Sequence, residues 1–375
     1  MPSKQQVGYC TNVHAGVSLE EVKANLKRYA CEVKKTVSPA EAMPVGLWLA
    51  NETIATMAAT DAAQFRVWLD QQGLLAFTFN GFPFGDFHQP VVKHNVYLPT
   101  WAEDARLDYT VKLAELLAVL DAGKLDFATI STLPLGWPDR SREDESFLET
   151  CGKNLAKCAE ALKRIHDNSG VQIMLCIEPE PGCVLDTASD VVGFFERFIS
   201  ENNREYIGVC HDICHSAVMF EPQRDAIELY HANAIRIGKC QVSSALEVDF
   251  DLDAPLEGLV DELLRFDEPR YLHQTCVNQN GKVQFFEDLG HAIDDCGKRG
   301  VWRTHFHVPI SNGRVGRLGT TQSEIAAFLD HADVDSMQFE IETYAWDVLP
   351  PEAKPVDLQT SISKEIEYFR TLLQG

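Results

Sequence analysis

Short apolar runs alternate along the whole chain with longer segments in which apolar residues recur at helical spacing. The short runs predict buried strands, and the longer periodic segments predict amphipathic helices. Because parallel neighbours need a crossover connection, strands that alternate with helices are expected to form a parallel sheet. The eight predicted strands are Val7–Val13, Val45–Ala50, Leu74–Asn80, Phe127–Thr132, Gln172–Glu178, Tyr206–Asp212, Ile235–Gln241 and Met337–Thr343.

Eight strand–helix units favour an α/β fold of the (β/α)8 TIM barrel type. The alternative is a doubly wound sheet, but no dinucleotide-binding glycine fingerprint follows the first strand. The 375 residues exceed the ~250 typical of the barrel, and we place the surplus in insertions at about 81–99 and 243–300. Tyr271–Val277 and Lys282–Phe286 predict an inserted hairpin, and Trp302–Val308 predicts an inserted strand, between the seventh and eighth units. Residues 1–375 are interpreted as a single domain.

Net charge and cysteine content limit the binding partners and the cellular compartment that can be expected for this chain. The formal net charge of −23 disfavours binding to nucleic acid and to anionic membranes. No apolar run approaches the ~20 residues that span a bilayer, so no membrane insertion is expected. The 11 cysteines are an odd number without a CxxC pair, which indicates buried thiols in a reducing cytoplasm. A small-molecule substrate is the expected partner, and a homo-oligomer is compatible with the sequence.

Polar side chains gather on one face of the last predicted strand. Alternation along Met337–Thr343 places Gln338, Glu340 and Glu342 together, opposite an apolar face that suits packing under helices. The polar face is therefore expected to point into the barrel, where two carboxylates need a cation or protons. The same alternation predicts three more inward-facing sets: Met174, Cys176 and Glu178; Gly208, Cys210 and Asp212; and Ile235, Ile237, Lys239 and Gln241.

Histidines extend this polar constellation. The His-x-His pair of His305 and His307 offers two adjacent metal ligands, and Asp212-x-x-His215 offers two more across a strand-to-loop turn. For any single carboxylate the alternative is a helix cap or a surface group. Polar residues nevertheless recur at the ends of consecutive strands, which predicts a divalent-metal site at the mouth of the barrel. The oxygen-rich ligand set favours Mn²⁺ or Mg²⁺, and the histidines keep Zn²⁺ as an alternative. The recurring residues are Glu178, Asp212, Gln241, His307 and Glu342.

The order of these residues resembles the xylose isomerase-like TIM-barrel superfamily, which includes sugar isomerases, ketose 3-epimerases, inosose dehydratase-like enzymes and the endonuclease IV branch. The resemblance implies a divalent metal held by Glu178, Asp212, Gln241 and Glu342. Gln241 stands where the family usually has histidine, and an amide oxygen is a weaker ligand, so His215 or His307 would make up the loss. The His305–Phe306–His307 run resembles the Asp-x-His metal pair of the endonuclease IV branch, with histidine replacing aspartate.

Longer motifs resemble a narrower group, the EboE metabolite-traffic family. These motifs are Gly-Tyr-Cys-Thr-Asn-Val-His at 8–14, Asn-Gly-Phe-Pro-Phe-Gly at 80–85, Ser-Thr-Leu-Pro-Leu-Gly-Trp at 131–137, Glu-Pro-Glu-Pro-Gly at 178–182 and Glu-Thr-Tyr-Ala-Trp-Asp-Val-Leu-Pro at 342–350. That family is named for its gene neighbourhood, so this resemblance implies the fold and the site without specifying a reaction.

Weaker candidates lie near the same strand ends. Lys239 faces inward beside Gln241, where it could polarise a substrate carbonyl or pair with a nearby glutamate. For the others, ordinary packing or a structural hydrogen bond is the alternative to substrate binding. The weaker substrate-binding candidates are His14, His88, Trp137, Glu180, Glu340 and Trp346.

The sequence thus predicts a metal-dependent isomerase, epimerase or related lyase acting on a small polyol, ketose or cyclitol-like molecule. Glu178 and Glu342 are expected to serve as base and acid on the two faces of the substrate. The metal would contact two adjacent substrate oxygens and stabilise developing negative charge. A second hypothesis is a non-catalytic protein that binds and hands on a metabolite within a biosynthetic or export assembly. A third, an abasic-site endonuclease, is disfavoured by the charge of −23.

Overall fold

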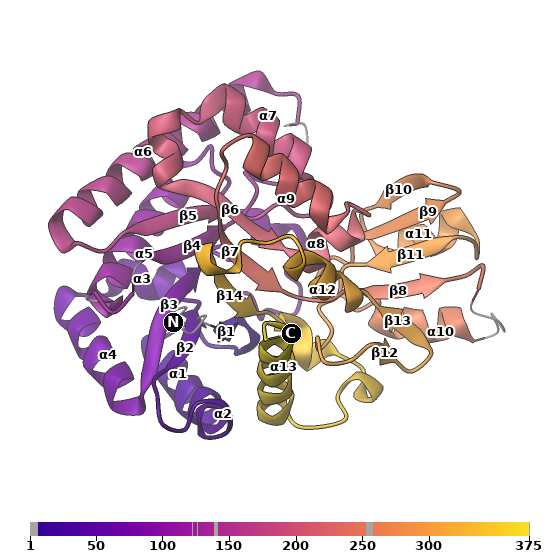
Figure 1. The fold of residues 1–375 in the computed structure, drawn as a ribbon, viewed down its shortest axis with the longest axis horizontal. Coiled ribbons are helices and arrows are strands. Elements are labelled where there is room, and N and C mark those ends of the chain that lie inside the picture. The colour runs from indigo at the N-terminus through magenta and orange to yellow at the C-terminus, as the bar shows by residue number, and fades with distance from the viewer. Residues whose placement is uncertain (1–6, 122, 126, 139–141, 253–257, 375) are drawn as a thin grey trace.

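Eight parallel strands close into a barrel, as the sequence predicts (Figure 1). The computed structural model describes residues 7–121, 123–125, 127–138, 142–252 and 258–374. Around the barrel the strand order is β1-β14-β7-β6-β5-β4-β3-β2. The barrel strands are β1 (Val7–Cys10), β2 (Met43–Leu47), β3 (Leu74–Asn80), β4 (Ala128–Thr132), β5 (Ile173–Ile177), β6 (Ile207–Asp212), β7 (Ile237–Val242) and β14 (Gln338–Ile341).

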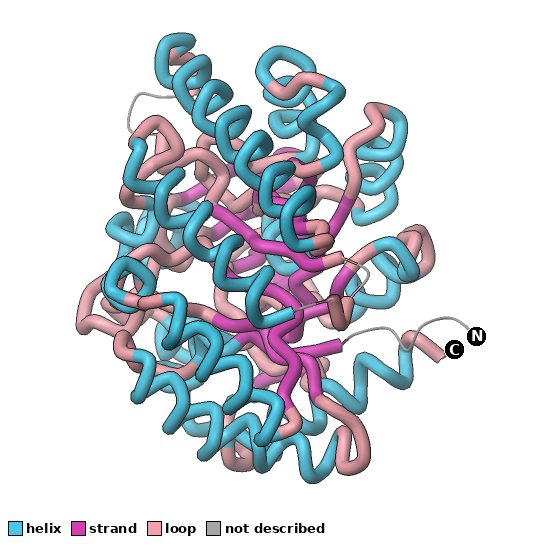
Figure 2. Tube along the Cα trace, turned by 90° about the vertical axis from the view of Figure 1, so that its left-hand side faces the viewer, coloured by secondary structure: helices cyan, strands magenta, loops and turns pink. Residues whose placement is uncertain are grey.

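Helices surround the strands on the outside of the barrel (Figure 2). Local capping fixes several of their ends: Ser18 and Glu21 form a capping box at the start of α1, and Gly73 ends α4 in the left-handed conformation. The helices are α1 (Leu19–Asn25), α2 (Cys31–Val37), α3 (Asn51–Thr56), α4 (Ala59–Gln72), α5 (Asp104–Asp121), α6 (Glu145–Ser169), α7 (Ala188–Phe198), α8 (Ile213–Val218), α9 (Gln223–Ala232), α10 (Leu259–Leu263), α11 (Leu289–Cys296), α12 (Ser323–Leu329) and α13 (Leu358–Leu372). Among the described residues, none of these helices combines the length and the apolar character needed to cross a membrane.

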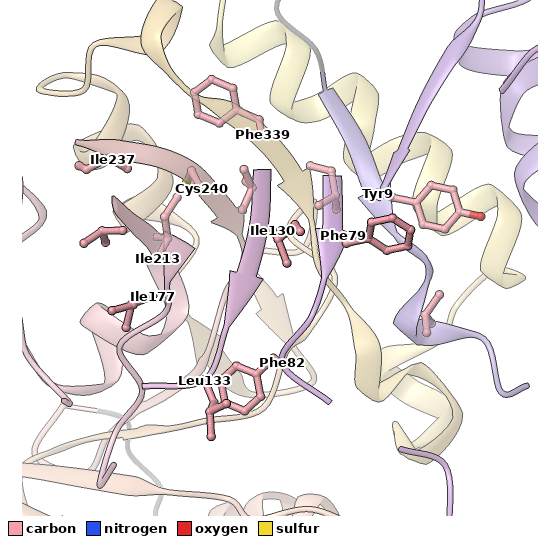
Figure 3. Close-up of a cluster of buried hydrophobic side chains, with 14 of the residues drawn as sticks. Tyr9, Phe79, Phe82, Ile130, Leu133, Ile177, Ile213, Ile237, Cys240 and Phe339 are labelled. Atoms are coloured by element: carbon pink, nitrogen blue, oxygen red, sulfur yellow. The ribbon is translucent and has the colours of Figure 1, made fainter. Parts of the chain in front are cut away.

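The main hydrophobic core lies between the strands and the helices. Its side chains come from the outward face of each strand, as Figure 3 shows for Ile177, Ile237 and Phe339. The ring of Phe339 packs against Phe369 of α13, with ring centroids 5.1 Å apart. The expected inward orientation of Ile237 is therefore wrong. The register between β6 and β7 shifts at this level, and Gly238 instead faces the barrel interior.

The barrel interior is polar below its mouth. Lys239 and Glu340 form an ion pair of 2.7 Å there, and both side chains are fully buried. Lys239 Nζ also donates a hydrogen bond to Ser131 Oγ. Gly46 makes room for the pair, because a Cβ at this position would lie 1.3 Å from Glu340 Oε1. Gln338, one layer further down, accepts a hydrogen bond of 2.6 Å from Thr129 Oγ1. The polar face predicted for the last strand therefore points into the barrel.

The segment between β7 and β14 builds a second, antiparallel sheet of six strands beside the barrel (Figure 1). The predicted hairpin is present as β9 and β10, and the predicted inserted strand begins as β11. Three further strands, β8, β12 and β13, were not predicted, and the last two extend the insertion beyond Gly300. Residues 253–257 lie outside the described residues. The six strands are β8 (Leu246–Asp249), β9 (Thr275–Gln279), β10 (Lys282–Phe286), β11 (Val301–Thr304), β12 (Arg314–Val315) and β13 (Leu318–Thr320).

The loop after β3 is tied to this insertion. The backbone N–H groups of Val92 and Lys93 donate to the carbonyl of Arg270, at 2.7 and 2.9 Å. Tyr271 Oη donates to the Phe87 carbonyl, and Lys93 pairs with Asp288 in the insertion. The two longest connections of the chain therefore meet over the mouth of the barrel.

Candidate metal centre

Three carboxylates from neighbouring parts of the barrel meet at its mouth. Glu178 directly follows β5, Asp212 ends β6 and Glu342 directly follows β14. One oxygen of each lies within 4.8 Å of the other two, and all three residues are buried. Parallel strands end at the same side of a barrel, which is why residues far apart in the sequence converge here.

Two of the three carboxylates, Glu342 and Asp212, are oriented by hydrogen-bond donors. Asn12 and Asn80 donate amide hydrogens to Glu342 Oε1, at 2.7 and 2.9 Å. Ser243 Oγ and the backbone N–H of His215 both donate to Asp212 Oδ1, at 2.7 and 2.9 Å. Among the described residues, Asp212 Oδ2 and Glu178 Oε2 have no hydrogen-bond partner.

Gln241 is placed next to these acids. It pairs with Glu340 across β7 and β14 and with Asp212 across β6 and β7, and its side chain is completely buried. Among the described residues, neither its Oε1 nor its Nε2 has a hydrogen-bond partner. A buried amide with both ends unpaired is costly. Together with the free carboxylate oxygens, it leaves several acceptor atoms that a cation would satisfy.

The raised pKa values of two of the carboxylates also indicate a cation site. Burial, followed by the charges of Glu342 and Asp212, raises the pKa of Glu178 well above its ordinary value. Burial and the charges of Asp212 and Glu340 raise the pKa of Glu342 to about 8. Carboxylates that repel one another in a buried site bind either protons or a cation. The residues therefore fit a divalent cation.

A cluster of three imidazoles adjoins the carboxylates. His305 Nε2 lies 3.2 Å from His215 Nε2 and 3.2 Å from His307 Nε2. His215 is in the first turn of α8, whereas the other two follow β11 in the insertion. Asp212 lies close enough to His215 and His307 to complete a second possible ligand set. Asp212 thus belongs both to the set of three carboxylates and to a set with two of the imidazoles.

The opposite nitrogen of each imidazole has an oxygen partner. The Nδ1 atoms of His215 and His307 lie 2.8 Å from the Pro179 carbonyl and 3.0 Å from the Glu342 carbonyl. Both carbonyls can only accept, so these Nδ1 atoms carry the hydrogens and the Nε2 atoms present lone pairs. Burial lowers the pKa of His215 to about 3 and that of His307 to about 4, which keeps both rings neutral. Three converging neutral imidazoles are the arrangement expected of a metal site.

A polar network from the insertion orients the third imidazole. His305 Nδ1 lies 2.8 Å from Gln274 Oε1. Gln274 Nε2 donates to Glu180 Oε1 at 2.8 Å, and Tyr97 Oη donates to the same oxygen at 2.7 Å. Burial raises the pKa of Glu180 to about 7, although these two hydrogen bonds lower it in part. Gln274 therefore couples the imidazole group to a carboxyl that faces the same cavity.

One cavity collects these groups. Its volume is about 530 Å³, which includes space open to solvent. Its polar end contains Glu178, Glu180, Glu342 and the three histidines, together with Asn12 and Asn80. The rest of its wall comes from the loop after β3, from residues 271–272 of the insertion and from Tyr344 after β14. Carboxylates and imidazoles in such a cavity can bind a cation and exchange protons with a small molecule.

Comparison with known proteins identifies the family. The family model described as a xylose isomerase-like TIM barrel matches residues 10–263. The chain belongs to this family. No protein with curated annotation matches the sequence. The narrower EboE resemblance stays a prediction.

Solved structures share the fold at low sequence identity. A xylose isomerase-like TIM-barrel protein from Mycobacterium smegmatis in complex with magnesium has a TM-score of 0.54 and 10% identity, covering 99% of this chain and 97% of that one. An L-ribulose 3-epimerase has a TM-score of 0.51 and 12% identity, with coverage of 98% and 94%. A D-psicose 3-epimerase from Clostridium cellulolyticum H10 with D-tagatose has a TM-score of 0.51 and 12% identity, with coverage of 98% and 99%.

Most candidate ligands of this xylose isomerase-like chain converge, but the weaker candidates are spread more widely. Glu180 lines the cavity, whereas Glu340 lies beneath it in the pair with Lys239. His14 lies in a separate small cavity, stacked on Tyr29. His88 Nε2 lies 2.7 Å from the carbonyl of Asn12. Of the two tryptophans, Trp137 packs against Tyr97 of the cavity wall and Trp346 is buried in the hydrophobic core.

Lys239 has a partner of its own. Burial, the largest single influence, would lower the pKa of this ammonium group, but the charges of Glu340, Glu178 and nearby cysteines together outweigh burial and raise it. Lys239 remains charged in the interior and contributes positive potential below Glu178. Its contacts are with Glu340 and Ser131 rather than with the cavity wall.

Several residues of the centre were missed by sequence reasoning. Asn12 and Asn80 follow β1 and β3 within motifs quoted above, so their position at strand ends was an available signal. Tyr97 and Gln274 carried no such signal, because they lie in the two long connections whose folding depends on contacts with each other. Tyr344, two residues after Glu342, was present in the last motif but was not singled out.

Proposed function

We propose that this chain is a divalent-metal-dependent isomerase or epimerase, or a related lyase, acting on a small polyol, ketose or cyclitol-like molecule. Its family and the epimerases among its structural neighbours support this class of reaction. The observation that carries the proposal is the convergence of three carboxylates and three neutral imidazoles at one cavity in the mouth of the barrel. Cytoplasmic location and the absence of a nucleic-acid partner remain part of the proposal.

Two adjoining ligand sets would hold the metal. Glu178, Asp212 and Glu342, with Gln241 Oε1 beside them, form an oxygen set that suits Mn²⁺ or Mg²⁺. Asp212 also belongs to the second set, with His215 and His307, and His305 Nε2 lies 3.2 Å from both of these imidazoles. Imidazole nitrogens suit Zn²⁺. A bound divalent cation would polarise adjacent substrate oxygens and stabilise negative charge that develops on them.

The chain's own residues then account for proton transfer. Glu178 and Glu342 enter the cavity from β5 and β14, which are separated in the barrel by β6 and β7. Among the described residues, one Glu178 oxygen has no hydrogen-bond partner, and it can accept a proton from a carbon next to a substrate carbonyl. Glu342 is held by two amide donors and can return a proton to the other face. The loop after β3 and the insertion, which are joined by hydrogen bonds, line the cavity beside these two groups.

The proposal is tested by combining metal analysis with hydrogen exchange. Elemental analysis of protein that has never met a chelator should find a bound divalent metal. In D₂O, NMR should then show deuterium entering a carbon next to the carbonyl in at least one member of a panel of ketoses and keto-cyclitols. Glu178→Gln should abolish both metal binding and exchange, whereas the matched control Glu196→Gln, an exposed residue of α7, should change neither.

Two outcomes would contradict the enzyme. A protein without divalent metal excludes the metal-dependent reaction. A metal-loaded protein that retains a metabolite through purification and never converts it supports the alternative, a non-catalytic metabolite-binding protein. Mass spectrometry of the bound compound before and after prolonged incubation distinguishes this second outcome.

A further inference from the structure

The cavity lining has two chemically distinct parts. Besides the carboxylates and imidazoles, it includes apolar and aromatic side chains, of which Phe87, Val92 and Tyr271 pack together in one hydrophobic cluster. They come from segments far apart in the sequence, namely the loop after β3 and the insertion. Six of them form the apolar wall: Phe82, Phe87, Val92, Val96, Tyr271 and Leu272.

Three polar side chains close to this apolar wall already have partners. Tyr97 Oη donates to Glu180 Oε1, and Tyr271 Oη donates to the Phe87 carbonyl. Lys93 forms an ion pair with Asp288. These contacts engage polar atoms that a substrate hydroxyl would otherwise bind, whereas an apolar group needs no partner there.

The apolar wall is also held in place. Two backbone hydrogen bonds join Val92 and Lys93 to Arg270. Phe87 packs on Tyr271, with ring centroids 5.0 Å apart, and on Tyr344 at 5.4 Å. Since these contacts cross between the loop and the insertion, the wall is a preformed surface that a ligand meets in this shape.

The polar end offers an anchor of the opposite kind. Asn12 lines the cavity, and its Nδ2 is fixed by the hydrogen bond to Glu342. Its Oδ1 is buried and has no hydrogen-bond partner among the described residues. A hydroxyl hydrogen of a ligand would satisfy this acceptor. Donor-bearing oxygens are therefore favoured beside the metal ligands and disfavoured at the far end.

We infer that the substrate is amphipathic: adjacent oxygens at one end and an apolar alkyl, alicyclic or aryl substituent at the other. This inference rests on the proposed function, because the oxygenated end is the part presented to the metal centre. It deepens that function by separating the substrate from sugars that carry hydroxyls along their whole length. Each methylene buried against the wall contributes about 0.8 kcal/mol, or roughly fourfold in affinity.

Three hydroxamates with one chelating head group test the inference by calorimetry on the metal-loaded protein. Acetohydroxamate reports on the head group alone, hexanohydroxamate adds an apolar chain, and gluconohydroxamate adds a hydroxylated chain of the same length. Hexanohydroxamate should bind at least about tenfold more tightly than acetohydroxamate, which allows for incomplete burial of its four additional methylenes. Gluconohydroxamate should bind no more tightly than acetohydroxamate.

Matched variants locate the effect on the wall. Val92→Thr/Val96→Thr keeps the side-chain shapes and should lower hexanohydroxamate affinity while leaving acetohydroxamate affinity unchanged. Val91→Thr is the control, because Val91 is 54% exposed on the same loop and does not line the cavity. A gluconohydroxamate that binds more tightly than hexanohydroxamate, or variants without effect on the long chain, would overturn the inference alone. Absence of both metal and hydroxamate binding would contradict the proposed function, and the inference would fall with it.

Discussion

The buried pair of Lys239 and Glu340 gives the sharpest prediction about stability. Glu340→Gln removes one charge from a pair with a separation of 2.7 Å and leaves the ammonium group of Lys239 in the barrel interior. At an effective dielectric constant of about 20, the Coulomb energy lost at this distance is roughly 6 kcal/mol. Desolvation offsets part of that energy, so we expect a loss of about 3–5 kcal/mol in the free energy of unfolding.

Removing both charges should cost much less than removing either one. Lys239→Met alone leaves Glu340 unpaired among other acids and should also cost about 3–5 kcal/mol. The double variant Lys239→Met/Glu340→Met should lie within about 2 kcal/mol of the wild type, because no uncompensated charge remains. A large coupling energy between the two positions is therefore expected.

The assay is urea unfolding at equilibrium in the presence of a chelator, so that bound metal does not contribute to stability. Additive losses, or single losses below about 1 kcal/mol, would refute the reasoning that an unpaired buried charge dominates. The double variant also tests the predicted catalytic role of Lys239. Full stability and metal binding without hydrogen exchange would assign Lys239 a catalytic role, whereas retained exchange would assign the pair a structural one.

Two further predictions concern single carboxyl and amide groups. Glu365 is buried, and burial raises its pKa from 4.5 to about 7. A raised carboxyl pKa favours the protonated folded state, so the wild type should lose roughly 3 kcal/mol relative to Glu365→Gln as pH rises from about 4.5 to about 7. Parallel urea titrations of both proteins measure this, with the exposed Glu367→Gln as control; a constant difference would contradict it. Gln241→His should tighten Zn²⁺ binding by about tenfold, roughly 1.4 kcal/mol, because imidazole is the better ligand. Competition with a chelating dye checks this, and unchanged affinity would place residue 241 outside the centre.

Strand alternation made the barrel and the convergence of its three carboxylates predictable. A period of two is local information, and in a closed parallel barrel it determines both which side chains face inward and at which end they meet. Glu178, Asp212 and Glu342 follow from that rule alone. The rule fails at Ile237, because an irregularity at Gly238 shifts the register of β7 against β6 and turns the preceding side chain outward. Alternation recovers at Lys239 because the irregularity is confined to that position.

The second sheet was predictable only in part, because most of its pairings join segments that are distant in the sequence. Its hairpin has a local signal, since β9 and β10 are joined by the turn at Asn280–Gly281. β12 and β13 are only two and three residues long; they pair with each other, and β13 joins the sheet by pairing with β8, which precedes it by more than sixty residues. The contacts of Gln274 with Tyr97 and His305 likewise join segments that are distant in the sequence. No periodicity of the intervening sequence encodes such contacts.

The barrel and the insertion contribute different kinds of residues to the candidate metal centre. The barrel strands supply the candidate oxygen ligands, whose positions are set by the closed sheet. The insertion supplies His305 and His307, the amide of Gln274 that orients the first of them, and part of the apolar wall through Tyr271. In the proposed enzyme, metal preference and substrate selection therefore depend most on the part of the chain that departs from the simple barrel. Changes in the insertion can alter both properties while Glu178 and the rest of the carboxylate group keep their place.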